Sequence, residues 1–365
     1  MKHKFYIGAY TEPIKFGTGD ILQSKGEGII SALFDDSTGE IQILNINKNI
    51  ENPSFLTLDS TGKYLYTVNE LKKWKNKESG TVSAFKVDKN TGELVFLNRR
   101  LTHGKDPCHI VIDKKEQNVY VSNFMNGSIC VIPIDKDGSL KAEYESIQHQ
   151  GSSINKQRQA GPHAHACVFD KEEKIAIIPD LGLDKLMVYK MDKENGKLAE
   201  LVIGLDVIKG GGPRSGCFNK KGDKCYFIME LASMIVVYNY DKERCEFSEI
   251  QCVKTIPNDF KMDNICAHIQ LSKDEKYLYA SNRGHDSIVT YKVDKDDGKL
   301  SYFESVSCFG KTPRHFSIDP TGKYILVANQ DSDGVVVMKI DENTGKMKKV
   351  NILEVGTPVC IRFEP

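Results

Sequence analysis

A short motif, an acidic residue followed within a few positions by a tight turn, recurs seven times along this chain of 365 residues. The copies read DSTGEI, DKNTGEL, DKDGSL, DKENGKL, DKERCEF, DKDDGKL and DENTGKM. Their turn residues are Gly39, Gly92, Gly138, Gly196, Cys245, Gly298 and Gly345. Because the copies lie 46 to 58 residues apart, the chain is predicted to repeat one structural unit seven times.

Each repeat carries the pattern of four β-strands. A run of β-branched and aromatic residues, such as 82–87 or 288–293, precedes each acidic turn and predicts a hairpin. A second strand-turn-strand pattern, for example LDSTGKYLYTVNE, alternates with the first, and an X-Pro dipeptide usually opens it. Four strands per repeat, without a long helical period, predict an all-β fold, a seven-bladed β-propeller.

The two ends of the chain match consecutive strands of one repeat. The C-terminal GTPVCIRFEP matches the strand-opening KTPRHFSIDP, and the N-terminal KFYIGAYT matches KYILVANQ. We therefore expect one blade to be closed by the N- and C-terminal strands, which removes exposed sheet edges. No linker interrupts the repeats, so residues 1–365 are predicted to form a single propeller domain.

Composition narrows the classes of partner. Fifty Lys and Arg residues balance 50 Asp and Glu residues, so the chain lacks the electropositive surface that nucleic-acid binding needs. No apolar run approaches the roughly 20 residues of a membrane helix, and the N-terminal apolar stretch is too short for a secretory signal. The ten cysteines occur singly, which predicts free thiols and a cytoplasmic location. The sequence carries no signal for the oligomeric state.

Two registers of the repeat carry residues that break its consensus. Because the first strand of each blade lines a propeller's channel, side chains from distant repeats converge there. The positions after the opening proline include His109, His163, His165, Arg214, Arg314 and His315, and the end of the next strand carries Glu70, Glu230 and Arg283. Such a set is typical of an acid/base site for an anionic substrate; alternatively, these charges pair with one another or with water.

Several segments resemble a known family. They are QRQAGPHAHA from Gln157, PDLGLDKLMVY from Pro179, GGGPRS from Gly210, MEL from Met229, SNRGHDSI from Ser281 and TPRHFSIDPTGKYILVANQ from Thr312. Together they resemble the seven-bladed propeller lactonases, which include bacterial 6-phosphogluconolactonases and fungal carboxy-cis,cis-muconate cyclases. The resemblance covers essentially the whole chain. It implies hydrolysis of 6-phospho-D-glucono-1,5-lactone to 6-phosphogluconate, a step of the pentose phosphate pathway.

The resemblance also implies a catalytic group, made of His165 or His163 with Arg214, Glu230 and Arg283. The chain departs from the family pattern at Ser215, where members often have histidine, and at His268, where they often have glutamate. These departures leave the exact substrate open.

A lactone is already electrophilic, so the expected mechanism activates water and stabilises an oxyanion without a covalent nucleophile. Glu230 or a neutral His165 would take the water proton, and the planar donor forks of the two arginines would hold the oxyanion or an anionic group. The further candidates for binding a small anionic sugar lactone are Glu70, His109, His163, Lys311, Arg314 and His315.

Other readings of the same residues stay open. His163 and His165 lie two apart on one strand and could chelate zinc, but no further ligand motif is visible, so we expect no metal and no cofactor. The same base and arginines could close a lactone, as in a muconate cycloisomerase. A non-catalytic propeller that binds a ligand or a protein is the third possibility, since fold does not determine function.

Overall fold

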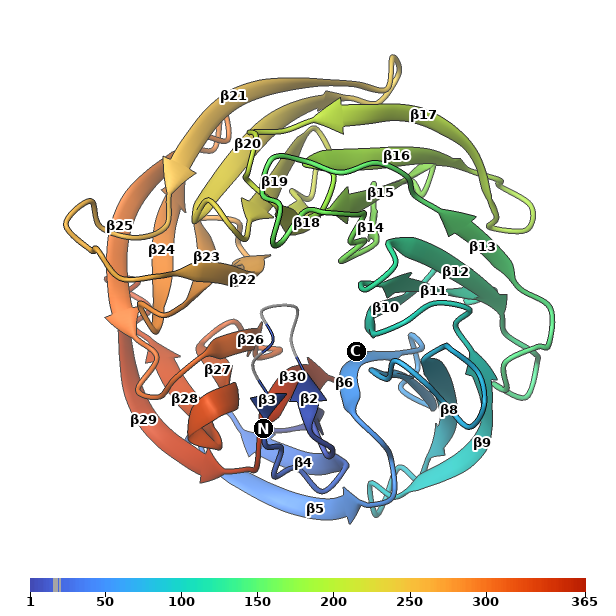
Figure 1. Ribbon diagram of the computed structural model, residues 1–365. Coiled ribbons are helices and arrows are strands. Elements are labelled where there is room, and N and C mark those ends of the chain that lie inside the picture. The colour runs from blue at the N-terminus through green and yellow to red at the C-terminus, as the bar shows by residue number, and fades with distance from the viewer. Residues whose placement is uncertain (16–18, 20) are drawn as a thin grey trace.

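Seven four-stranded antiparallel sheets surround a central channel in the computed structural model (Figure 1). The structure describes residues 1–15, 19 and 21–365. The predicted all-β, seven-bladed propeller is therefore confirmed. No helix within these described residues is long and apolar enough to cross a bilayer.

The blades follow the chain, each numbered from its innermost strand outward. Blade 1 contains β6 (Pro53–Leu58), β7 (Tyr64–Asn69), β8 (Thr81–Val87) and β9 (Leu94–Leu101). Blade 2 contains β10 (Pro107–Ile112), β11 (Asn118–Asn123), β12 (Ser128–Pro133) and β13 (Glu145–Gln148). Blade 3 contains β14 (Val168–Phe169), β15 (Ile175–Asp180), β16 (Lys185–Met191) and β17 (Leu198–Asp206). Blade 4 contains β18 (Pro213–Phe218), β19 (Lys224–Met229), β20 (Met234–Asp241) and β21 (Glu246–Lys254).

The remaining elements complete the ring. Blade 5 contains β22 (Ile265–Leu271), β23 (Tyr277–Arg283), β24 (Ser287–Val293) and β25 (Leu300–Ser307). Blade 6 contains β26 (Pro313–Ile318), β27 (Tyr324–Asn329), β28 (Gly334–Ile340) and β29 (Met347–Glu354), with the short 3₁₀ helix η1 (Gln330–Ser332). Blade 7 contains β30 (Pro358–Phe363), β1 (Lys2–Ala9), β4 (Ile29–Asp35) and β5 (Ile41–Asn47). A small hairpin pairs β2 (Ile14–Lys15) with β3 (Ile21–Leu22).

Both termini build the seventh blade, as the matching end sequences predict. Strand β1 pairs antiparallel with β30, and Phe5 lies opposite Phe363. On its other side β1 pairs with β4. The C-terminal strand is thus the innermost strand of a blade whose other strands come from the N-terminus, and this shared blade closes the ring.

The repeated acidic motif forms the hairpin that joins the two outer strands of a blade. In blade 7 the amide of Gly39 donates to the carbonyl of Asp35 at 2.8 Å, and Gly39 has a φ of +78°. Glycine suits this left-handed conformation because it has no Cβ to clash with the backbone. In blade 4 Cys245 adopts a φ of +56° at the same position, and its side chain is half-buried against the cluster that contains Tyr240. This contact offsets part of a strain of about 1 kcal/mol or more.

The core lies between neighbouring blades. Seven clusters of buried apolar side chains lie around the ring, most of them formed by two neighbouring blades. In one of them Phe5 and Ile7 of blade 7 pack with Leu326 and Val337 of blade 6. Because each blade is packed on both faces, the innermost strands are held in fixed positions around the channel.

A β-bulge interrupts the innermost strand directly after its opening proline. In blades 1, 2, 4 and 6 the pairing with the second strand skips one residue, and these residues are Ser54, Cys108, Arg214 and Arg314. A bulge places two residues opposite one and re-aims the side chain. Two consecutive side chains in each of these strands can therefore face the channel, where a regular strand would present only one.

Candidate active site

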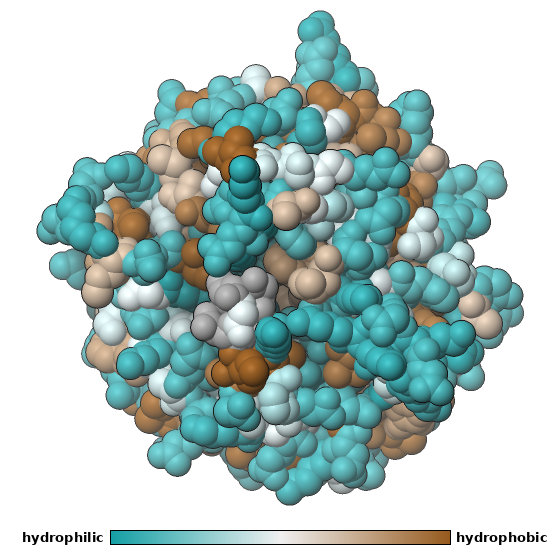
Figure 2. Space-filling view, viewed as in Figure 1, coloured by the Kyte–Doolittle hydropathy of each residue, from teal (hydrophilic) through white to brown (hydrophobic). Residues whose placement is uncertain are grey.

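All seven blades contribute to one cavity in the channel. It is lined by Ser54, Phe55, Glu70, Cys108, His109, His165, Ala166, Arg214, Ser215, His268, Arg314, His315 and Val359. The bulged residues and the residues that follow them supply most of this lining. Figure 2 shows that hydrophilic side chains dominate the face of the molecule seen in Figure 1. The ring thus gathers the predicted register positions around one polar space.

Glu230 is the centre of an arginine cluster beside this cavity. Its Oε2 accepts hydrogen bonds from Nε of Arg214 and Nη2 of Arg283, each at 2.8 Å, and its Oε1 accepts one from Nη2 of Arg158 at 2.7 Å. The backbone of Glu230 also bridges two blades, since its amide donates to Gly212 and its carbonyl accepts from Cys266. The carboxylate is therefore fixed in position by both its backbone and its side chain.

The charges of this cluster determine its protonation states. Burial by itself would raise the pKa of Glu230, but the charges of Arg283, Arg214 and Arg158 outweigh it and hold that pKa well below its usual range. Burial lowers the pKa of Arg283 to about 10, so this guanidinium stays charged at neutral pH. Three positive charges therefore surround one negative charge, and the cluster carries a net positive charge of two units.

His165 lies at the edge of the arginine cluster and lines the cavity. Its Nε2 is 4.0 Å from Oε2 of Glu230, its Nδ1 is 3.5 Å from Sγ of Cys108, and Phe124 packs edge-on against its ring. Burial, followed by the charge of Arg214, lowers the pKa of His165 well below its ordinary value, although Glu230 opposes the shift. His165 is therefore a neutral imidazole at neutral pH.

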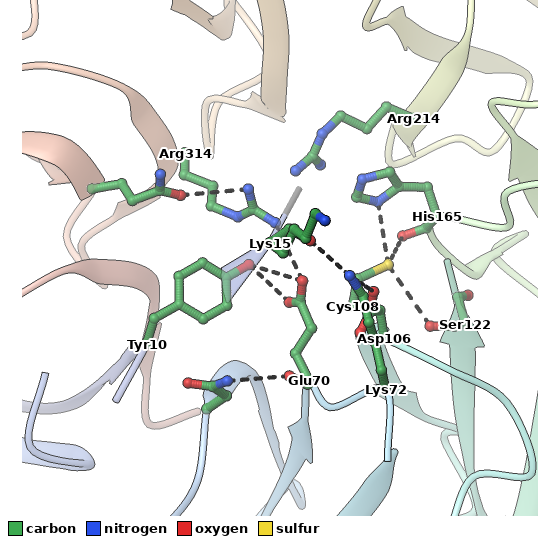
Figure 3. Close-up of polar contacts among 12 residues, drawn as sticks. Tyr10, Lys15, Glu70, Lys72, Asp106, Cys108, Ser122, His165, Arg214 and Arg314 are labelled. Carbon is green, nitrogen blue, oxygen red and sulfur yellow. Dashed lines mark hydrogen bonds and ion pairs between the residues drawn. The ribbon is translucent and has the colours of Figure 1, made fainter. Parts of the chain in front are cut away.

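A second polar group, made of Tyr10, Glu70 and Arg314, lies near His165 and Arg214 (Figure 3). The hydroxyl of Tyr10 lies 2.9 Å from both carboxylate oxygens of Glu70, and Nη2 of Arg314 is 3.9 Å from Oε1 of Glu70. The guanidinium of Arg314 also stacks over the ring of Tyr10, 5.4 Å from its centroid. In Figure 3 the guanidinium of Arg214 points toward the space between His165 and Arg314. One arginine balances one glutamate here, unlike in the cluster around Glu230.

Three neutral histidines and Phe55 form another part of the cavity wall. His268 stacks on His315 with ring centroids 4.1 Å apart, and Phe55 packs against His109 at 4.5 Å. Burial, followed by nearby arginine charges, lowers the pKa of His109 and of His268 to about 3. The pKa of His315 is also well below its ordinary value because of burial. These rings can exchange hydrogen bonds with a ligand without carrying charge.

The structure brings most of the predicted site residues together, but two lie elsewhere. The ring of His163 stacks on Phe124, and its Nδ1 is 2.8 Å from the carbonyl of Phe124, so it does not line the cavity. Lys311 is exposed on the connection before β26. Glu230 and Arg283 contact Arg214 or its partners and lie behind the cavity wall. The catalytic roles given to these residues stay predictions.

Sequence reasoning missed other residues that contact the site. Arg158 lies in the QRQ segment, seven residues before His165, and belongs to no register of the repeat. Tyr10 ends the YIGAY segment, and Cys108 was expected only as one of the free thiols. The segments that carried the family resemblance contained the signal for Arg158, since only two residues separate QRQ from the PHAH motif. Across the described residues, no group of three or more His, Cys, Asp or Glu side chains is placed to hold a metal ion.

Comparisons with known proteins agree with this geometry. The family model described as "Lactonase, 7-bladed beta-propeller" matches residues 4–363. The chain is 33% identical over 320 residues to a 6-phosphogluconolactonase of Bacillus subtilis, covering 88% of this chain and 86% of the relative. It is also 33% identical to a 6-phosphogluconolactonase of Formosa agariphila, over 87% of this chain and 86% of that one. The periplasmic gluconolactonase of Pseudomonas aeruginosa has a structure that matches with a TM-score of 0.91 at 28% identity, covering 100% of this chain and 99% of the other.

Three findings support an enzymatic function: the propeller architecture, the match over nearly the whole chain and the relatives' shared activity class. The hypothesis of a non-catalytic binding propeller therefore loses its support. The chain belongs to the seven-bladed β-propeller lactonase family and is a lactonase.

Proposed function

We propose that the protein hydrolyses 6-phospho-D-glucono-1,5-lactone to 6-phosphogluconate, a step of the pentose phosphate pathway. The observation that carries the proposal is the net charge of two units around Glu230, beside a cavity whose wall also presents the neutral imidazoles of His109, His268 and His315. A phosphoryl group carries nearly two negative charges at neutral pH, and a sugar lactone adds hydroxyls that suit neutral imidazoles. The two relatives named 6-phosphogluconolactonase support the same substrate.

The reaction needs a base for the attacking water and a donor for the developing oxyanion. His165 suits the first role because it is neutral and lines the cavity. If its Nδ1–H donates to Cys108, whose thiol can in turn donate to the carbonyl of Ser122 at 3.7 Å, the lone pair of Nε2 is free to accept a proton. Glu230, 4.0 Å from that nitrogen, stabilises the imidazolium that forms.

Arg214 suits the second role. Only its Nε is committed to Glu230, and its terminal nitrogens point into the cavity (Figure 3). Because the guanidinium is already oriented by Glu230, it needs little reorganisation when the lactone carbonyl oxygen becomes negatively charged. Protonation of the ring oxygen by the His165 imidazolium then completes ring opening, so the water proton ends on the new hydroxyl. We also propose a cytoplasmic location, because the ten cysteines of the sequence occur singly, as is usual in a reducing compartment.

The substrate assignment is tested by comparing three compounds with the same enzyme preparation. We expect kcat/KM for 6-phosphogluconolactone to exceed that for unphosphorylated gluconolactone by at least about tenfold, because one charge-assisted contact to phosphate contributes that much. Hydrolysis is followed at constant pH by acid release, and the spontaneous rate is subtracted. Equal rates for the two lactones, or turnover of only a carboxylated muconate, would reject the assignment.

Substrate binding is also expected to depend on pH through Asp106. Burial, followed by the charge of Glu70, raises the pKa of Asp106 to about 7, although Lys72 and Lys105 oppose the shift. Above that pH the ionised carboxylate adds negative charge near Glu70, which lines the cavity. We therefore expect KM for the phosphorylated lactone, divided by KM of Asp106→Asn at the same pH, to rise about fivefold from pH 6 to pH 8. The division removes the effect of the substrate's own phosphate, which also ionises in this range. A ratio that stays constant would contradict the assignment of the titrating group.

A further inference from the structure

Arg158 comes from a loop that belongs to no blade. It lies in the connection between β13 and β14, in a segment that follows the outer strand of blade 2 and returns to the channel (Figure 1). The side-chain oxygen of Asn155 accepts the amide of Arg158 at 3.1 Å. The neighbouring Gln159 is fully buried and donates to the carbonyl of Leu181 at 2.9 Å and to Asp184 at 2.6 Å. The backbone of Arg158 is therefore held firmly on the propeller.

The three arginines around Glu230 occupy different positions. Arg214 and Arg283 share Oε2, and each side chain is 10% exposed. Arg158 alone binds Oε1, and its side chain is 19% exposed. Among the described residues Glu230 is the one partner of its guanidinium, and only Nη2 makes that contact. Arg158 is thus the most exposed arginine of the cluster, with two nitrogens still able to donate. Like Glu230 and Arg283, it lies beside the cavity and is not part of its lining.

The other cations near the cavity are less suited to an incoming phosphoryl group. Lys311, one of the expected ligands of the anionic lactone, is exposed on the connection before β26, and no contact joins it to the cluster around Glu230. Arg314, another expected ligand, is stacked on Tyr10 and lies beside Glu70, whose negative charge repels an anion. The charge around Glu230, by contrast, is positive by two units, and this excess matches a phosphoryl dianion.

We propose that Arg158 binds the phosphoryl group of the substrate and makes the enzyme prefer phosphorylated lactones. This inference rests on the proposed function and adds the residue that recognises the phosphate. The free nitrogens of the Arg158 guanidinium donate to the phosphoryl oxygens while Nη2 stays on Glu230. Arg214 then remains available for the lactone carbonyl.

The test compares Arg158→Ala, Arg158→Lys and wild type on 6-phosphogluconolactone and on gluconolactone. We expect the ratio of the two kcat/KM values to fall by about 10- to 100-fold in Arg158→Ala, mainly through KM for the phosphorylated lactone. Arg158→Lys should restore part of the ratio, because it keeps the charge but loses the planar fork. Lys156→Ala is the matched control: it removes a charge from an exposed residue of the same loop and should leave the ratio unchanged.

A second readout uses inorganic phosphate as an inhibitor of gluconolactone hydrolysis. We expect its inhibition constant to rise at least about tenfold in Arg158→Ala and to stay at the wild-type value in Lys156→Ala. If both lactones lose the same factor and phosphate inhibition is unchanged, Arg158 only positions Glu230 and the inference is wrong. If wild type shows no preference for the phosphorylated lactone, the proposed function fails instead. Should Arg158→Ala not fold, Arg158→Gln gives the same comparison with a side chain of similar length.

Discussion

Glu230→Gln is expected to lower lactone turnover at least about 100-fold while the substitution keeps the shape of the side chain. The amide removes the only negative charge among three guanidiniums, and its NH₂ group cannot accept the hydrogen bonds that one carboxylate oxygen now receives. Arg214 then loses the partner that orients it toward the cavity, and His165 loses the charge that would stabilise its protonated form. Steady-state kinetics with 6-phosphogluconolactone measures the loss.

The same substitution should also lower the free energy of unfolding by about 3 to 5 kcal/mol, because it leaves buried charges without their partner. The pKa of Glu230 is lower in the folded state than in the unfolded state, so its ionisation stabilises the fold at every pH above the unfolded value. This contribution declines as the pH falls below the unfolded value and is lost as the pH passes through the depressed folded value. Urea unfolding at pH 7 and at pH 6 should therefore show the same deficit in the variant, and the deficit should become smaller below about pH 4.

Glu70→Gln is the matched control for both measurements. Glu70 is a buried glutamate at the same register of blade 1, but it accepts from Tyr10 and lies near a single arginine. Its substitution should cost less turnover and less stability than Glu230→Gln. A folded Glu230→Gln enzyme with a near-normal rate would remove Glu230 from the mechanism.

The repeats were sufficient to predict the fold and the region of the site. Turn residues at regular spacing define the blades, and the blade geometry brings Arg214, Glu230 and Arg283 together although they lie far apart in sequence. The choice between His163 and His165 could not be made in this way, because both lie in the same segment and would share a face of a regular strand. In the structure His163 is held by Phe124, while His165 reaches the cavity just before the short strand β14.

Two other features depend on geometry that the sequence pattern does not encode. The bulge after the opening proline sends both Arg314 and His315 into the cavity, whereas the alternation of a regular strand would allow only one. Arg158 reaches Glu230 from a loop outside the repeat, so no register could reveal it. Lys311 was a candidate ligand because it lies beside the TPRH segment, but its side chain is exposed and does not line the cavity, so its role stays a prediction.

The sequence left both His165 and Glu230 as candidates for the general base. Their protonation states in the structure now favour His165. Glu230 binds three guanidiniums with both oxygens, and a carboxylate so strongly stabilised in its charged form is a poor proton acceptor. His165 is neutral and has one ring nitrogen directed toward the cluster. A bound phosphoryl group would compensate the arginine charges that now depress the pKa of His165, so the substrate itself would make this imidazole a stronger base.

His165→Asn should therefore lower kcat by about 10² to 10⁴, the usual contribution of a positioned general base. KM and the inhibition constant of inorganic phosphate should change little, because the arginines that attract the anion are intact. His163→Asn, two residues away and stacked on Phe124, is the matched control and should lose much less. Steady-state kinetics of both variants with 6-phosphogluconolactone decides the point. If His163→Asn lowers kcat more than His165→Asn does, His165 is not the general base that takes the proton of the attacking water.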